Sequence, residues 1–280
     1  MQDKDITTSR AYSIGLGLIM SALCCWLIVG CQSGADRATT RSDGIQAGTY
    51  LLTSVQPLDS QPTLDILSDS TLMSYVRSLA YSLYLFAPDG RCHRIRQGTL
   101  EQGRYVQTAL TFGLETYDRI ILGKQSLTLV VSRQVGQAKV PLTYKLYRLN
   151  LGTDQLRFTA LAENVFTHPV RSESDEKLRD RVKNSLYFYS LFFRTIYTNQ
   201  FNRFKPAAIS LPIRYYSGGI RVPVKFDSTA SWTALFASVD DARKAHSLYK
   251  EAAKKVKRYP AGESMIHEYG LVLADMANAL

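Results

Sequence analysis

Few side chains in this 280-residue chain could support metal or nucleophilic chemistry. The histidines are four in number, at His93, His168, His246 and His267. Glu263 lies four residues before His267, a spacing that could place a carboxylate and an imidazole on one helix face. Cys92 precedes His93, but neighbours in a strand point to opposite faces. Two ligands do not complete a metal site, so we expect no metal and no cofactor.

Serine-based patterns give no stronger indication of catalysis. The spacings Ser174-x-x-Lys177 and Ser247-x-x-Lys250 match the first motif of serine penicillin-interacting enzymes, but the accompanying Lys-Thr-Gly and Ser-Asp-Asn elements are missing from the sequence. No Gly-x-Ser-x-Gly elbow, glycine-rich phosphate loop or His-Glu-x-x-His pattern occurs. We therefore predict no catalytic residues, and a hydrolase is the least favoured of three functional hypotheses.

A cysteine at the end of an apolar segment is the most specific chemical signal. Residues 11–30 are uncharged and apolar, and they end in Leu27-Ile28-Val29-Gly30-Cys31. This segment resembles the lipobox of bacterial lipoproteins, in which the cysteine thiol receives diacylglycerol and the signal is cut on its amino side. The resemblance implies lipidation of Cys31 and removal of residues 1–30. An uncleaved membrane anchor and an ordinary signal peptide are the alternatives.

The residues after the cysteine extend this prediction. Gln32 resembles the outer-membrane sorting class of Gram-negative lipoproteins, which implies a lipid-anchored protein of the bacterial envelope facing the periplasm or the surface. Residues 31–47 then read as the acylated cysteine and a polar, flexible tether. Cys24 and Cys25 leave with the signal, so Cys92 remains as a lone thiol and no intrachain disulfide is expected.

The residue pattern of segment 48–163 indicates strands separated by turns. Apolar and β-branched runs predict eight strands, at 50–55, 81–87, 91–97, 104–110, 116–122, 126–133, 140–149 and 155–161. Ala87-Pro88-Asp89-Gly90 favours a tight turn between the second and third of them. Because closure removes exposed strand edges, we predict an eight-stranded antiparallel meander barrel.

One long insertion and the opening of the first strand refine this prediction. In residues 56–80, Ser70 is a candidate helix cap and Leu72, Val76 and Leu79 have helical spacing, which predicts a short helix that could plug the barrel. Gly48-Thr49-Tyr50 resembles the Gly-x-aromatic opening of bacterial lipocalin-like lipoproteins. The resemblance implies a small apolar ligand inside the barrel.

Residues 164–280 predict a helix-rich α+β unit. Ser172 and Asp175 resemble a capping box at the start of a helix. An apolar stripe runs along this predicted helix, and between residues 187 and 193 every face of the helix is apolar. Such a helix is normally buried at the centre of its unit, and an exposed partner-binding surface is the alternative. Residues 209–216 and 220–226 predict a hairpin, and Ser238 caps a helix expected over 240–259. A last helix is expected over 264–279.

Charge is concentrated in this second unit. The chain carries 34 Lys and Arg against 24 Asp and Glu, a formal net charge of +10. The helix over 240–259 places a basic surface opposite an alanine-rich face: Arg243, Lys244, Lys250, Lys254, Lys255, Lys257 and Arg258. Lipid phosphates or other envelope anions are the expected counter-charges, because an exported protein rarely meets nucleic acid. A solvated surface on a helix packed against its neighbour is the alternative.

Two functions remain after these exclusions. With 45% hydrophobic and 21% charged residues, the chain is neither disordered nor fibrous. We expect a non-enzymatic envelope lipoprotein that binds a small apolar ligand in its barrel. The alternative is a structural or adaptor lipoprotein that docks an envelope protein assembly through its aromatic and basic C-terminal half.

Overall fold

A computed structural model of the chain describes residues 44–58, 76, 79, 82–96, 98–106, 109–113, 115–135, 138–199, 214–216, 219–221, 235–256 and 265–280. The predicted signal, the predicted lipidation site Cys31 and most of the predicted tether lie outside these residues. The strands are β1 (Gly48–Pro57), β2 (Leu83–Phe86), β3 (Arg91–Arg96), β4 (Thr99–Val106), β5 (Ala109–Phe112), β6 (Glu115–Thr116), β7 (Arg119–Leu122), β8 (Ser126–Val135), β9 (Ala138–Arg148), β10 (Arg214–Tyr216) and β11 (Gly219–Arg221). The helices are η1 (Gly152–Asp154), α4 (Gln155–Phe166), α5 (Asp175–Thr198), α7 (Val239–Lys255) and α8 (Met265–Asn278).

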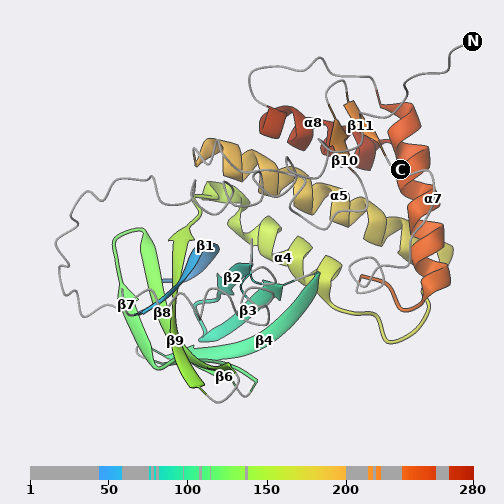
Figure 1. Cartoon of the computed structure of the whole chain (residues 1–280). Coiled ribbons are helices and arrows are strands. Elements are labelled where there is room, and N and C mark those ends of the chain that lie inside the picture. Colours follow the sequence, from blue (N-terminus) through green and yellow to red (C-terminus); the bar gives the residue numbers. More distant parts are fainter. Residues whose placement is uncertain are drawn as a thin grey trace, which may run out of the picture. The chain divides into compact units, whose positions relative to one another are not determined.

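Nine of the strands form one curled antiparallel sheet in the order β6-β5-β4-β3-β2-β1-β9-β8-β7, a half-barrel in shape (Figure 1). Its two end strands are separated in the chain by Tyr117 and Asp118 alone. The backbone N–H of Tyr117 donates to Leu110 O in β5 at 3.2 Å, and that of Asp118 donates to Val130 O in β8 at 2.8 Å. These two residues therefore contact both ends of the sheet. The predicted antiparallel, barrel-like meander is confirmed in this coarser form.

Individual strand boundaries differ from the prediction where the sequence lacks a turn signal. The tight turn at residues 87–90 is present, with Gly90 N–H donating to Ala87 O at 3.2 Å. The run 104–110, predicted as one strand, instead contains the end of β4 and the start of β5, because Val106 pairs with Ala109. The run 116–122 is divided between β6 and β7. No glycine or proline marks either break.

The eighth predicted strand, residues 155–161, is wrong because this segment is the first part of α4. Its alternation of Leu156, Phe158 and Ala160 indicated a half-buried strand, but Leu156 is 84% exposed. The buried residues follow helical spacing instead: Phe158 and Ala162 are four apart, and Val165 and Phe166 continue the same face. The chain therefore changes from strands to helices at η1, before the predicted boundary at residue 164.

The side chains inside the curl form one apolar cluster, which we call the inner core. It includes aromatic residues from opposite sides of the sheet: the Tyr117 ring lies 6.1 Å from Tyr144 on β9 and 6.4 Å from Phe112 on β5. Tyr84, Leu110 and Leu129 in the same cluster are fully buried. Of the predicted plug helix, Val76 and Leu79 are described, and both are helical and pack against this core. The rest of that helix lies outside the described residues.

The helices gather on one side of the sheet and enclose a second core (Figure 1). α5 lies at its centre, and the consecutive residues Leu191, Phe192 and Phe193, which point to different faces of α5, are all buried. The prediction of a central buried helix is confirmed. Its cap is Ser174, whose Oγ accepts from Lys177 N–H at 3.4 Å, and not Ser172. Ser174 lies immediately before the first helical residue, which is the position that an N-cap must occupy.

The remaining elements match their predicted types over the described residues. Ser238 caps α7 by accepting from Asp241 N–H at 3.1 Å. The helix ends at Lys255, and the predicted continuation to residue 259 lies outside the described residues apart from Val256, which is extended. β10 and β11 pair as the predicted hairpin, of which only residues 214–216 and 219–221 are described.

Candidate ligand-binding cleft

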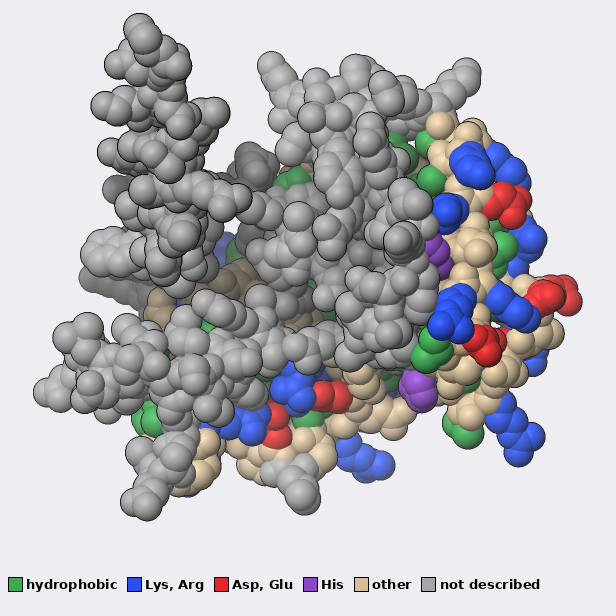
Figure 2. Space-filling view, turned by 45° about the vertical axis from the view of Figure 1, so that its right-hand side comes forward, with side chains coloured by type: hydrophobic (Ala, Val, Ile, Leu, Met, Phe, Trp, Pro, Cys, Tyr) green, Lys and Arg blue, Asp and Glu red, His purple; other side chains and the backbone are tan. Residues whose placement is uncertain are grey.

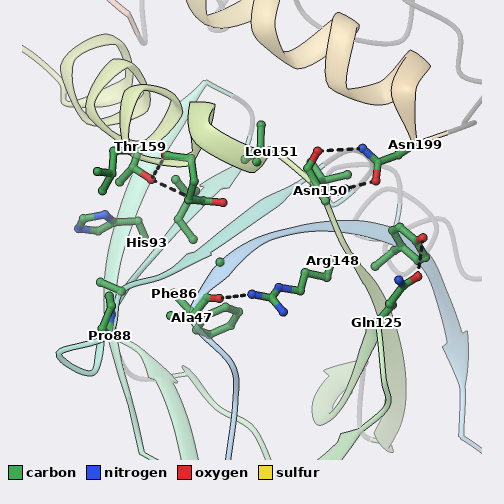
Figure 3. Close-up of a pocket in the computed structure, with 18 of the residues that line it drawn as sticks. Ala47, Phe86, Pro88, His93, Gln125, Arg148, Asn150, Leu151, Thr159 and Asn199 are labelled. Carbon is green, nitrogen blue, oxygen red and sulfur yellow. Dashed lines mark hydrogen bonds between the residues drawn. The ribbon is translucent and has the colours of Figure 1, made fainter.

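The sheet and the helices border a cleft of about 1080 Å³, lined by the start of β1, the β2–β3 turn, the β7–β8 turn, the end of β9 and one side of α4 (Figure 3). Its volume is at the upper end of the range typical of small-molecule sites. The wall is chemically mixed: Leu85, Phe86 and Leu156 are apolar, whereas Asn150 and Gln155 are polar. Since Leu156 is 84% exposed, the α4 wall presents apolar surface to the cleft.

Hydrogen bonds between distant segments fix the walls of the cleft. At its upper end in Figure 3, Asn150 N–H donates to Asn199 Oδ1 at 3.1 Å, which ties the end of α5 to the segment after β9. On the α4 wall, Gln155 Nε2 donates to Thr49 Oγ1 on β1 at 2.9 Å. These bonds hold helix and sheet at a defined separation, so the cleft is built into the fold.

Arg148, the last residue of β9, extends into the cleft and bonds the segment that leads into β1 (Figure 3). Its Nη1 donates to Gln46 Oε1 at 2.7 Å and its Nη2 donates to Ala47 O at 2.9 Å. Gly48, with φ of 148°, follows directly, and a Cβ at this glycine would lie only 3.0 Å from Arg148 Nε. A glycine is therefore required for the guanidinium to sit this close to the chain.

The acceptors of Arg148 are both neutral, which distinguishes it from comparable arginines. Among described residues of known exposure, five arginines are buried or half-buried. Four of them form ion pairs with glutamates: Arg94, Arg96, Arg133 and Arg181. Arg148 forms none with any described carboxylate. A half-buried guanidinium without a counter-charge favours binding of an anion.

Two further cations and one carboxylate complete the charged lining. Lys124 lies in the β7–β8 turn and has no hydrogen-bond or ion-pair partner among the described residues, and Arg91 pairs with the exposed Asp89 at 2.6 Å. On the opposite wall Glu163 Oε1 lies 3.4 Å from His93 Nδ1, joining α4 to β3. Among its described lining residues, the cleft thus has three basic side chains, Arg91, Lys124 and Arg148, against one acidic side chain, Glu163.

A second polar site lies inside the sheet, where an ion network joins β3, β4, β6 and β8. Arg94, 2% exposed, donates from Nε to Glu101 Oε2 at 2.6 Å and from Nη2 to Glu115 Oε2 at 3.0 Å. Arg133 Nη2 also bonds Glu115 Oε2 at 2.6 Å. The network therefore joins strands on both sides of the Tyr117 and Asp118 segment.

The charges of this network are mutually stabilised. Burial disfavours ionisation of Glu115, but the hydrogen bond and charge of Arg94, together with Arg133, outweigh it and lower its pKa below the usual value. Burial also disfavours the cationic form of Arg94, yet its bond to Glu115 keeps its pKa raised. Arg94 Nη1 additionally donates to the Tyr117 hydroxyl at 2.9 Å. The charges of this network are thus paired with one another inside the fold, whereas Arg148 has no described carboxylate as a partner.

The predicted basic surface lies on the exposed side of α7, as far as it is described. In Figure 2, Lys and Arg side chains alternate with Asp and Glu along the right-hand side of the molecule. Three of the predicted cations have acidic partners: Arg243 pairs with Asp240, Lys244 with Asp175 and Lys255 with Glu251. Lys250 and Lys254 are also on this helix, whereas Lys257 and Arg258 lie outside the described residues.

The residues first considered for chemistry are separated or have backbone roles. The Cys92 side chain lies in the inner core, where burial raises its pKa to about 12, and it points away from His93, which lines the cleft. Ser247 Oγ donates to Arg243 O at 3.3 Å. Glu263 lies outside the described residues, so its pairing with His267 stays a prediction. His168 is exposed and His246 is buried on α7.

Over the ranges that the structure describes, no group of three or more His, Cys, Asp or Glu residues is arranged to hold a metal ion. None of the helices in this part of the chain combines the length and apolar character that a membrane crossing needs.

Sequence reasoning missed both arginine sites. A signal for Arg94 was present, because strand alternation places it on the same face as Cys92 and therefore inside the sheet. No such signal exists for Arg148. It stands out only because the fold brings no described carboxylate close to it, and the sequence does not show this. Comparison with protein-family models and with curated proteins finds no match to this chain.

Proposed function

We propose that this chain is a lipid-anchored protein of a bacterial cell envelope that binds a small ligand and does not catalyse a reaction. The lipobox resemblance ending at Cys31 supports the anchor. A cleft with exposed apolar and cationic lining supports binding. The serines and histidines first considered for chemistry hold backbone groups, line walls or lie apart, which favours a binding role over catalysis.

The sheet fits a lipocalin-like barrel of eight strands if β6 and β7 act as one bent strand. The bonds from Tyr117 N–H to β5 and from Asp118 N–H to β8 support this interpretation, since they connect the two ends of the sheet. The Arg94 network supports it as well, because Glu115 on β6 is bonded to both Arg94 on β3 and Arg133 on β8.

We place the ligand in the cleft and not inside the barrel. One observation carries this choice: the cleft of about 1080 Å³ exposes Leu156, whereas the inner core is filled by rings in contact with one another. Phe86 and Tyr105, for example, have centroids 5.0 Å apart. An apolar ligand inside the barrel stays a prediction that would require these rings to move.

The adaptor alternative has less support. Four of the six aromatic residues of α5, which it required as a docking surface, are buried in the helix core, whereas Tyr187 is half-buried and Tyr197 is 42% exposed. Three cations of the basic surface are already paired with acids on the same surface. The aromatic residues that follow Asn199, Phe201 and Phe204, lie outside the described residues.

Native mass spectrometry of the full-length protein purified from bacterial membranes tests the binding role. We expect a co-purifying small molecule in the wild type and its loss in Ala160→Trp, which fills the cleft from the exposed face of α4. Arg157→Trp is the matched control, since this exposed α4 residue does not line the cleft. Retention of the ligand in Ala160→Trp would contradict the cleft as its site.

A further inference from the structure

The charge of Arg148, which no described carboxylate compensates, determines what the cleft can recognise. Two of its N–H groups bind neutral oxygens, which leaves Nε–H and one N–H on each terminal nitrogen available. A guanidinium with donors in this fork suits a carboxylate or phosphate group. Lys124 on the β7–β8 turn adds a second cation at the same cleft.

The apolar lining sets the second requirement. Leu156 is a large side chain left 84% exposed on a helix whose opposite face is fully packed. Ala160, one turn further along α4, is also exposed and lines the same wall. Covering such surface with hydrocarbon is favourable by about 25 cal/mol for each Å² removed from water.

We propose that the cleft binds an anionic amphiphile, a molecule with one carboxylate or phosphate group and a hydrocarbon portion. The anion bonds Arg148 with Lys124 nearby, and the hydrocarbon covers Leu156 and Ala160. This inference rests on the proposed function, because it names the ligand class of the same cleft. Free fatty acids and phosphate esters of lipids share this chemistry.

Isothermal titration calorimetry with soluble probes tests the ligand class. The full-length protein is placed in nanodiscs of zwitterionic lipid, and heats from empty nanodiscs are subtracted. The probes are octanoate, octyl phosphate, octanol and inorganic phosphate. We expect octanoate or octyl phosphate to bind at least tenfold more tightly than octanol and inorganic phosphate. The affinity of these anionic probes should fall when salt is added. The tighter of the two anions identifies the fatty acid or lipid phosphate as the source.

Variants assign the charge to Arg148. Arg148→Gln should weaken the anionic probes by about ten- to hundredfold, as expected for charge-assisted hydrogen bonds, and leave octanol unchanged. Unchanged octanol binding also shows that the cleft is still folded. Lys124→Gln, which removes a side chain without partners among the described residues, should weaken the anions about two- to fivefold. Arg104→Gln on β4, exposed and outside the cleft, is the control.

The outcomes separate this inference from the proposed function. Equal binding of octanol and octanoate, abolished by Ala160→Trp, would overturn the anion requirement and leave the cleft as a ligand site. Inorganic phosphate as tight as octyl phosphate would overturn the apolar requirement. Failure of all four probes to bind the wild type would overturn the amphiphile, while the co-purification experiment would still decide whether the cleft holds another ligand.

Discussion

Arg94 and Arg148 are in the same sheet but in opposite chemical settings. Arg94 is fully buried in the inner core and is neutralised by Glu101 and Glu115, with the Tyr117 hydroxyl as a further partner. Arg148 is half-buried at the cleft, and within the described part of the chain it bonds a side-chain amide and a backbone carbonyl but no carboxylate. The difference separates structure from recognition: a charge that the fold satisfies stabilises the fold, and one that it leaves uncompensated attracts a ligand.

Removing each guanidinium should give the largest contrast in stability. Arg94→Leu removes the cation that Glu101 and Glu115 share, although Glu101 keeps Arg96 and Glu115 keeps Arg133 as a partner. The loss should therefore be at most about 3–5 kcal/mol, the cost of removing one member of a buried ion pair. Arg148→Leu removes two bonds to neutral acceptors and should cost about 1 kcal/mol. Urea denaturation of both variants measures the two losses. Equal losses would remove the distinction between the sites.

Acid should weaken the inner network with a defined sign. The pKa of Glu115 is lowered in the folded protein. The stability that its ionised carboxylate contributes is therefore complete at pH values above the unfolded pKa of about 4.3, and it is lost as pH falls through the folded pKa. Glu115→Gln should therefore be less stable than the wild type by about 1–3 kcal/mol at pH 7.

The gap between the two proteins should narrow toward pH 3, where the wild-type carboxyl is being protonated as well. Chemical denaturation of wild type and Glu115→Gln at pH 7, 5 and 3 gives the comparison. A gap that is constant across these pH values would show that Glu115 is not held ionised by Arg94 and Arg133.

The sequence predicted the elements better than the sites. Period-two alternation and the turn at residues 87–90 were sufficient for most of the meander, and the all-round apolar segment of α5 was sufficient for its burial. Leu156 shows why the local sequence pattern gave the wrong secondary structure. Its alternation with Phe158 fits a strand, but Phe158 and Ala162 are buried together with residues of α5, and this packing requires a helix. The packing partner is remote in sequence, so the pattern cannot include it.

The same limit applies to the arginines. Arg94 and Glu115 are 21 residues apart in the chain and meet only because the sheet curls. Arg148 and Gln46 are separated by 102 residues. Which arginine receives a carboxylate and which does not is therefore a property of the tertiary structure, and spacing alone does not reveal it.

The smallest expected effect concerns the carboxylate in the cleft. Glu163, half-exposed beside His93, repels an anionic ligand but contributes little to stability as a surface group. Glu163→Gln should tighten octanoate binding about two- to fivefold and change the free energy of unfolding by less than about 0.5 kcal/mol. Calorimetry and urea denaturation provide the two values. Weaker octanoate binding would indicate that Glu163 assists the ligand.

A crystal structure of the full-length protein grown with octyl phosphate tests the central claim most directly. We predict the phosphate within hydrogen-bond distance of the Arg148 guanidinium and the octyl chain against Leu156, with the rings of Tyr84 and Phe112 unmoved in the inner core. An octyl chain located among those rings, with the cleft unoccupied, would contradict the account and return the ligand to the interior of the sheet.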